Sequence, residues 1–263
     1  MPLSDLTIIV PVYGKPQLVY DCLRSVSGEN VVVIDDCGPQ EREIVKVCAK
    51  FEAAYGRNQT NLGFLRTVNG AVDMTDTEYV LLLNSDCIVS DGSIHHMMTV
   101  SRAFEADIVG CRLLFPDKNQ RVQHAGVASG VGGLPYHPFM YLHKDTPHVN
   151  RVMCVNAVTG AAMLIKRAAW DELNGFDTAF GLGVFEDVDF CWRARAMGKT
   201  VIYDGYVFMY HHMHGSKHNH GYHHDVSGQN LKLLADRHQM GVDEHLFYGN
   251  VQSMCGRDGK CKF

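Results

Sequence analysis

The triplet Asn84-Ser85-Asp86 follows directly after the apolar run Tyr79-Val80-Leu81-Leu82-Leu83. A run of that length predicts a buried strand, which places the polar triplet at the carboxyl end of that strand. In open α/β sheets this edge is where ligands bind. A carboxylate there, beside an amide and a hydroxyl, suits a hard divalent cation that carries a phosphorylated ligand. The same residue types also favour an Asx turn that only closes a strand, so the triplet alone leaves both interpretations open.

A second acidic pair, Asp35-Asp36, follows the apolar run Val31-Val32-Val33-Ile34. Either carboxylate could accept a hydrogen bond from the N–H of a nucleotide base, with Tyr13 from the loop after the first strand covering the ring. A solvated turn explains the two acids equally well.

A third cluster, Glu186-Asp187-Val188-Asp189, places three carboxylates in four residues after the glycine-rich stretch 180–185. The apolar spacing that follows predicts an amphipathic helix beginning at these acids. Acidic residues stabilise the start of a helix, so capping is one explanation. A positioned general base after a flexible loop is the other, and the pattern favours neither.

Seven of the 15 histidines lie between residues 210 and 224. Neutral imidazole is a common ligand of transition metals, so one or more could bind a metal, although a solvated polar loop explains most of them. The spacing matches no zinc finger. Cys255 and Cys261, in a tail rich in Gly, Lys and Arg, are weak evidence for a metal clip and fit a frayed terminus as well.

The elements that must position these residues alternate along the first half of the chain. Apolar runs predict strands at 6–10, 31–34 and 79–83, and helical spacing predicts helices at 17–26, from about 40 to 55, and through 69–74. This alternation predicts an α/β fold with a doubly wound, mostly parallel sheet and a ligand crevice at the strand ends. Neither a Gly-x-Gly-x-x-Gly motif after the first strand nor a Walker loop is present, which disfavours dinucleotide and P-loop chemistry.

The second half is less periodic. Residues 106–115 are expected to form a strand pair, 123–150 long loops and short strands, and 158–165 a small-residue turn into a strand. A helix is expected from about Arg167 to a cap at Gly175. Because no linker separates the halves, we expect one domain over 1–225, with a nucleotide-binding half (about 1–115) and a smaller acceptor-side half (about 116–225), followed by a C-terminal helix and tail (226–263).

Composition narrows the class of protein. The chain has 263 residues, 46% hydrophobic and 20% charged, and a formal net charge of −5, which makes a nucleic-acid groove an unlikely main function. The sequence has no apolar run of the roughly 18 to 20 residues that cross a bilayer, and its start does not read as a signal peptide. The nine cysteines are scattered, so most are expected to be reduced and buried. We therefore expect a cytoplasmic protein, for which peripheral attachment to a membrane stays open.

Seven motifs in order resemble the family 2 glycosyltransferases, which are inverting enzymes of GT-A fold. The resemblance covers Leu6 to Ser216 and rests on Pro11-Val12-Tyr13, Asp35-Asp36, Asn61-Leu62-Gly63-Phe64, Asn84-Ser85-Asp86, Thr159-Gly160-Ala161, Glu186-Asp187 and His212-x-x-Gly215-Ser216. Each motif is weak singly, and their order makes the signal strong.

The resemblance implies roles for these positions. Pro11, Tyr13 and Asp35 or Asp36 would hold the base and ribose of the donor, while Asn61, Gly63 and Arg66 would line its base and diphosphate. Asn84, Ser85 and Asp86 would match the metal motif, with Asn84 in place of the first acid, so that Asp86 is the firm ligand for Mn²⁺ or Mg²⁺. His212 would complete the metal site, within a register that also admits His211 or His214. Thr159, Gly160 and Ala161 would shape the acceptor side, and Asp187 would be the general base, with Glu186 as its neighbour and substitute.

The implied reaction is a hexosyl-type transfer from a nucleoside-diphosphate sugar, most commonly a UDP-sugar in this family, to a hydroxyl of a glycan, a lipid-linked or another acceptor. A carboxylate would take the proton of the acceptor hydroxyl, and the cation would stabilise the departing diphosphate. Two alternatives remain at this stage. One is a nucleotidyltransferase, for which Pro11 to Lys15 is a poor triphosphate loop, and the other is a non-catalytic nucleotide- or sugar-binding module.

Overall fold

The computed structural model describes residues 3–130, 133–181, 183–212 and 222–238. Its strands are β1 (Leu6–Val12), β2 (Val31–Asp35), β3 (Ala54–Arg57), β4 (Tyr79–Leu83), β5 (Cys87–Val89), β6 (Ile108–Leu114), β7 (Val122–His124), β8 (Ala128–Ser129), β9 (Pro135–Tyr136), β10 (Val152–Cys154), β11 (Ala162–Lys166) and β12 (Val201–His211). Its helices are α1 (Pro16–Ser25), α2 (Glu41–Lys50), α3 (Phe64–Asp73), α4 (Ser93–Ala103), α5 (Arg167–Leu173), α6 (Glu186–Ala196) and α7 (Tyr222–His238). Two short 3₁₀ helices are also present, η2 (Pro147–Val149) and η3 (Thr178–Phe180).

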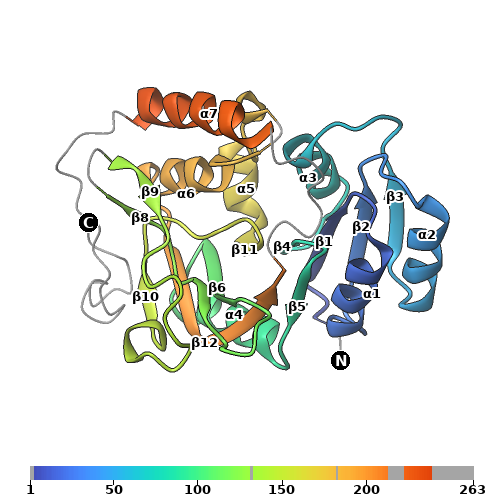
Figure 1. Ribbon diagram of the computed structural model, residues 1–263, viewed down its shortest axis with the longest axis horizontal. Coiled ribbons are helices and arrows are strands. Elements are labelled where there is room, and N and C mark those ends of the chain that lie inside the picture. Colours follow the sequence, from blue (N-terminus) through green and yellow to red (C-terminus); the bar gives the residue numbers. More distant parts are fainter. Residues whose placement is uncertain (1–2, 131–132, 182, 213–221, 239–263) are drawn as a thin grey trace.

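A mixed sheet of ten strands organises the described residues, in the order β10-β12-β6-β11-β4-β1-β2-β3, with β5 paired to β12 and β7 to β6. Strands β8 and β9 form a separate two-stranded sheet. Strands β4, β1, β2 and β3 are parallel to one another, as the first-half alternation predicts. Strand β11 runs antiparallel between β4 and β6, so the sheet is mixed rather than uniformly parallel. Helices flank it, with α1 and α2 beside β1 to β3, and α5, α6 and α7 gathered near the other half (Figure 1).

The core follows the apolar runs of the sequence. All five residues of β4 and all seven of β6 are buried, as expected for strands covered on both faces. Trp170 of α5 is 2% exposed and packs edge-on against Phe176 at a ring-centroid distance of 5.2 Å, so it is a core residue.

Several predicted boundaries need correction. The helix expected to run to residue 55 ends at Lys50, because Glu52 turns left-handed (φ 56°) and Ala53 N–H closes the end by donating to the Cys48 carbonyl. Strand β3 then takes the place of its last turn. The helix expected at 69–74 starts earlier, at Phe64, and residues 106–115 give one long strand rather than a pair. The boundary expected at residue 225 falls inside α7.

Among the described residues, six cysteines are free thiols and five of these are buried, which fits the expectation of mostly reduced cysteines. Cys154 differs, because it is disulfide-bonded. Within the described ranges, none of the helices combines the length and apolar character that a bilayer crossing requires.

Candidate active site

Asp86 and His211 face each other at the carboxyl end of β4. The Nε2 atom of His211 lies 3.2 Å from Oδ1 of Asp86, and both side chains are buried. Asn84 Nδ2 lies 3.4 Å from the same His211 nitrogen. Asp86, Cys87 and His211 offer potential metal ligands whose atoms all lie within 4.8 Å of one another.

Strand register selects His211 for this position. His211 pairs with Cys87 across β12 and β5, and the N–H of His212 donates to the Asp86 carbonyl at 3.0 Å. Successive side chains of a strand point to opposite faces. The ring of His211 is therefore turned to Asp86, while His212 is exposed, so the structure places His211 where His212 was expected. His214, the third candidate, lies outside the described residues, as do Cys255 and Cys261.

Gln123 selects the tautomer of the neutral His211 ring. Its Nε2 donates to the His211 carbonyl at 3.0 Å, which orients its Oε1 toward His211 Nδ1 at 2.6 Å. An amide oxygen only accepts, so Nδ1 must carry a proton and donate it. In the neutral ring Nε2 then presents a lone pair to the Asp86 carboxylate. Two acceptors 3.2 Å apart need a proton or a cation between them, and an imidazole and a carboxylate suit a divalent cation such as Mn²⁺.

Cys87 is a poor third ligand. Its Sγ donates to the Ala161 carbonyl at 3.4 Å. Burial and the neighbouring Asp86 charge raise the pKa of the Cys87 thiol well above its ordinary value. A thiol that keeps its proton does not bind a hard cation, so the residues that fit are Asp86 and His211.

Asp187 occupies the first turn of α6, half-buried. Its Oδ2 accepts from the Gly160 N–H at 2.9 Å and its Oδ1 from the Val188 N–H at 2.8 Å. Glu186 is also in this turn but is 8% exposed, so Asp187 is the more accessible acid.

The segment Thr159-Gly160-Ala161 joins the two acidic centres. Gly160 contacts Asp187, and the next residue, Ala161, accepts from the Asn84 N–H at 2.9 Å. Strands β11 and β4 pair immediately afterwards, with Ala162 opposite Leu83. One short backbone segment thus contacts both the Asn84-Ser85-Asp86 turn and Asp187.

Asp35 and Asp36 lie where the sequence predicts, at the carboxyl end of β2, but both carboxylates bind protein groups. Asp35 accepts from Gly38 N–H at 2.8 Å and Tyr55 hydroxyl at 3.0 Å, and pairs with Arg57. Asp36 fastens the loop before α3 by accepting from Asn58 Nδ2 at 2.9 Å, from Leu62 N–H at 2.7 Å and from Gly63 N–H at 2.9 Å.

The other predicted donor-side residues lie in or next to the loops that follow β1, β2, β3 and β4. Pro11 is opposite Ile34 in the β1–β2 ladder, and Tyr13 follows in the next loop, half-buried. Asn61 Oδ1 accepts from the Gly63 N–H at 3.0 Å, and Arg66 is exposed in the first turn of α3. Ser85 is buried beside Asp86. The strand order brings these loops to one edge of the sheet, together with the Asp86 turn.

A comparison with known protein families identifies the family of the chain. The family profile described as "Glycosyltransferase like family 2" matches residues 2–223. The chain belongs to that family. It is a glycosyltransferase domain by this match, and the resemblance seen in the seven motifs is confirmed.

Curated relatives of this family-2 domain are distant and longer. Over 155 residues it is 33% identical to the O-antigen biosynthesis protein RfbC of Myxococcus xanthus, covering 57% of this chain and 12% of the relative. It is 24% identical to the pre-mycofactocin glycosyltransferase of Mycobacterium tuberculosis, covering 79% of this chain and 42% of the relative. The "Uncharacterized protein y4gI" of Sinorhizobium fredii is 25% identical, and the match covers 81% of this chain and 25% of the relative. The chain thus spans less than half the length of each of these relatives.

Solved glycosyltransferase structures share the GT-A fold of the domain. GalNAc-T7, crystallised with UDP, GalNAc and Mn²⁺, superposes with a TM-score of 0.68 at 12% identity, covering 88% of this chain and 48% of that one. The mannosyltransferase PcManGT of Pyrobaculum calidifontis, in complex with GDP-Man and Mn²⁺, superposes with a TM-score of 0.63 at 15% identity. The match covers 90% of this chain and 64% of that one. The predicted fold class is therefore confirmed.

Two further histidines of the family-2 domain, His124 and His137, lie close to Thr159 and Asp187, and the sequence analysis did not single them out. His124 Nε2 accepts from the Gly126 N–H at 3.2 Å, so its Nδ1 holds the proton and faces His137 Nδ1 at 3.0 Å. Desolvation lowers the pKa of His137, and the charge of Asp187 opposes that shift, which places His137 in the field of the acid. Residues 123–150 lack periodicity, so no sequence pattern singled out these two histidines.

Proposed function

We propose that the protein is a metal-dependent inverting glycosyltransferase that moves a sugar from a nucleoside-diphosphate sugar to an acceptor hydroxyl. The first donor class that we propose is a UDP-sugar. The observation that carries the proposal is the pairing of the His211 Nε2 lone pair with the Asp86 carboxylate at the carboxyl end of β4. That edge of an open α/β sheet is where nucleotide ligands bind.

Asp86 and His211 would hold the cation, with Asn84 and Ser85 beside them. The donor set of one carboxylate and one imidazole leaves positions for diphosphate oxygens. A bound Mn²⁺ or Mg²⁺ would act as a Lewis acid that stabilises charge on the departing diphosphate. In the mannosyltransferase and GalNAc-T7 structures a nucleotide and Mn²⁺ are present together, which supports the same arrangement here.

On the donor side, Tyr13 and the loop fastened by Asp36 would contact the base and ribose. A carboxylate oxygen can accept two hydrogen bonds. A base N–H would therefore share Asp35 or Asp36 with the protein groups already bound there. Asn61, Gly63 and the exposed Arg66 would border the base and diphosphate. Pro11, near the carboxyl end of β1, would contact the base and ribose.

Asp187 would act as the general base. An acceptor hydroxyl is a poor nucleophile at neutral pH, so a carboxylate within hydrogen-bond reach must take its proton as attack proceeds. The Gly160 and Val188 N–H groups hold the Asp187 carboxylate in a fixed orientation. Direct attack by the acceptor on the anomeric carbon, with loss of the diphosphate from the opposite side, inverts the configuration in a single step. Thr159, Gly160 and Ala161 would border the acceptor, a glycan, lipid-linked or other hydroxyl compound.

The test is calorimetric titration with UDP, with and without Mn²⁺, on the wild type and on Asp86→Ala and His211→Ala. We expect UDP binding that depends on Mn²⁺ and is lost in both variants, whereas His212→Ala binds as the wild type does. Titrations with GDP and dTDP separate the donor base from the site. Failure of all three nucleotides to bind would contradict the proposed function, and a loss in His212→Ala alone would contradict the ligand assignment.

A further inference from the structure

The two residues that precede the acids of α6 have an unfavourable backbone conformation. Val184 has φ 79° and Phe185 has φ 72°, both in the left-handed region. Positive φ is rare for non-glycine residues, and for a β-branched residue such as valine it is an outlier. Such conformations persist only where the surrounding structure enforces them, and they concentrate at functional sites.

Asn230 of α7 supplies that enforcement. Its side chain is 6% exposed, and its Nδ2 lies 2.9 Å from the Phe180 carbonyl, 2.7 Å from that of Gly183 and 3.1 Å from that of Val184. An amide group has two N–H donors, so three carbonyls share them. The one side chain thereby ties the strained residue to the turn η3 that lies before it.

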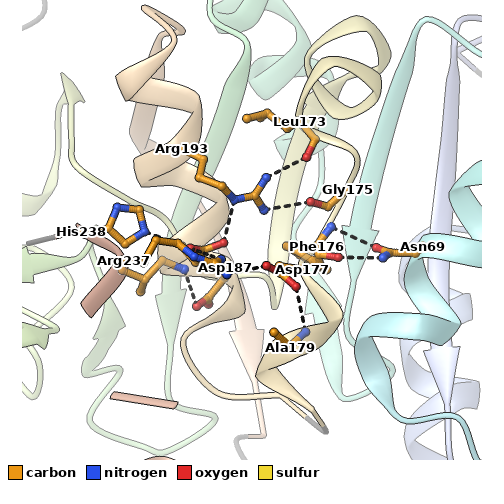
Figure 2. A network of polar contacts seen from close by, with 12 residues as sticks. Asn69, Leu173, Gly175, Phe176, Asp177, Ala179, Asp187, Arg193, Arg237 and His238 are labelled. Atoms are coloured by element: carbon orange, nitrogen blue, oxygen red, sulfur yellow. Dashed lines mark hydrogen bonds and ion pairs between the residues drawn. The ribbon is translucent and has the colours of Figure 1, made fainter. Parts of the chain in front are cut away.

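Ion pairs hold α7 in the position that this contact requires. Arg237 lies 2.6 Å from Asp177 and 2.9 Å from the buried Asp189, and His238 Nε2 lies 2.9 Å from Asp189. Arg193 of α6 completes the cluster at 2.7 Å from Asp189. Figure 2 shows Arg193, Arg237 and His238 gathered close to Asp177.

The strained pair sets the start of α6 and with it the position of Asp187. Phe185 is the residue before the helix, and its carbonyl accepts the N–H of Asp189 at 2.9 Å in the first turn. Asp187 lies within that turn and reaches Gly160 at 2.9 Å. A change of φ at Val184 or Phe185 would redirect the chain as it enters this turn and move the carboxylate.

We propose that Asn230 is a positioning residue for the transferase reaction: it holds Val184 and Phe185 in the left-handed conformation and so keeps Asp187 in place to take the acceptor proton. This inference rests on the proposed function. The proposed donor site lies at the ends of β1, β2 and β4. The hydrogen bonds of the Asn230 side chain in the described residues go instead to Phe180, Gly183 and Val184. Loss of Asn230 should therefore affect turnover and spare donor binding.

The test compares Asn230→Ala with Gln229→Ala, an exposed amide residue of the same helix, each alone and combined with Val184→Gly. We expect kcat of Asn230→Ala to fall about tenfold or more while KM for the donor stays within about twofold, as for lost transition-state contacts. Gln229→Ala should match the wild type. Because glycine adopts positive φ without strain, Val184→Gly should restore a large part of the activity of Asn230→Ala.

Three results would overturn the inference: an unchanged kcat in Asn230→Ala, a rise in donor KM that accounts for the whole loss, or no rescue by Val184→Gly while circular dichroism shows folded protein. If the wild type transfers no sugar, the proposed function fails on its own. Hydrogen exchange at the amides of residues 186–190 then decides the inference. Faster exchange in Asn230→Ala than in Gln229→Ala supports the positioning role, and equal exchange contradicts it.

Discussion

At the scale of single residues, the site depends on which protons its side chains hold. His211 has a defined tautomer because Gln123 both donates to its carbonyl and accepts from its ring. In the neutral ring this leaves Nε2 facing Asp86 as an acceptor, the form in which imidazole binds a metal. Asp187 is oriented by two backbone N–H groups, which fix the carboxylate without neutralising it.

Asp187→Asn should abolish transfer, because the amide has the shape of the carboxylate but does not accept a proton at neutral pH. A fall in kcat of about 100-fold or more is expected from the usual contribution of general-base catalysis. UDP binding by calorimetry should stay near that of the wild type. The exposed Asp171→Asn is the matched control, and near-normal turnover of Asp187→Asn would remove the residue from the role of base.

Gln123→Ala should weaken Mn²⁺ binding about 10- to 100-fold, the usual effect of removing the partner of a metal-binding histidine. The His211 ring would lose the bond that sets its tautomer and orientation. Calorimetric titration of Mn²⁺ in the presence of UDP measures the change, and Gln229→Ala is the control. Equal affinities in the two variants would show that Gln123 does not support the site.

At the scale of elements, strand register and close backbone approach bring distant motifs together. The pairing of β12 with β5 puts His211 beside Asp86, although the two residues are 125 positions apart in the sequence. On the donor side, the loops after β1 and β2 touch at Gly38. A Cβ atom added to Gly38 would lie 2.6 Å from the Gly14 nitrogen and 2.9 Å from the Tyr13 Cα.

Gly38→Ala should therefore destabilise the fold by about 1–3 kcal/mol, the usual cost of overpacking, and weaken UDP binding by displacing Tyr13. Gly70→Ala in α3 is the matched control, since its added methyl group would meet nothing within 4 Å. Urea unfolding gives the stability and calorimetry the affinity. If both alanine variants behave as the wild type does, the close approach of the two loops has no role in donor binding.

At the scale of the whole molecule, the Asp189 cluster connects η3, α6 and α7. Asp189 is fully buried and pairs with Arg193, Arg237 and His238. Burial alone would raise the pKa of Asp189, but the hydrogen bonds from His238 and Arg193 outweigh it, so the pKa lies below the ordinary value of 3.8. A lowered folded-state pKa means that the cluster stabilises the fold fully above pH 3.8 and that this stability is lost as the pH falls through the folded-state pKa.

Asp189→Asn should lower the free energy of unfolding by up to about 3 kcal/mol near neutral pH, because it leaves the half-buried Arg193 and Arg237 without their buried counter-charge. Urea unfolding at about pH 6 and about pH 3 checks the sign, since the gap between variant and wild type should narrow at the lower pH. The exposed Asp171→Asn serves as the control. A gap that stays constant with pH would mean that the charge of Asp189 contributes nothing.

The sequence by itself determined the fold class, the parallel strands β1, β2 and β4, and the polar residues at their carboxyl ends, because apolar runs of strand length and the residues that end them are local features. The order of seven motifs determined the family for the same reason, since each motif is a short local pattern. The helix boundaries near residues 50 and 64 were missed because they depend on a left-handed turn at Glu52 and on the Asp36 contacts to the loop before α3.

Only the tertiary structure decided which histidine faces Asp86, since adjacent strand residues point to opposite faces and the register of β12 against β5 is a long-range contact. It also revealed Gln123, His124 and His137 in a stretch without periodicity, and it showed that Asp35 and Asp36 bind protein groups. The contact of Asn230 with the strained residues before Asp187 joins segments more than 40 residues apart. No local pattern encodes such a contact, because packing among distant segments creates it.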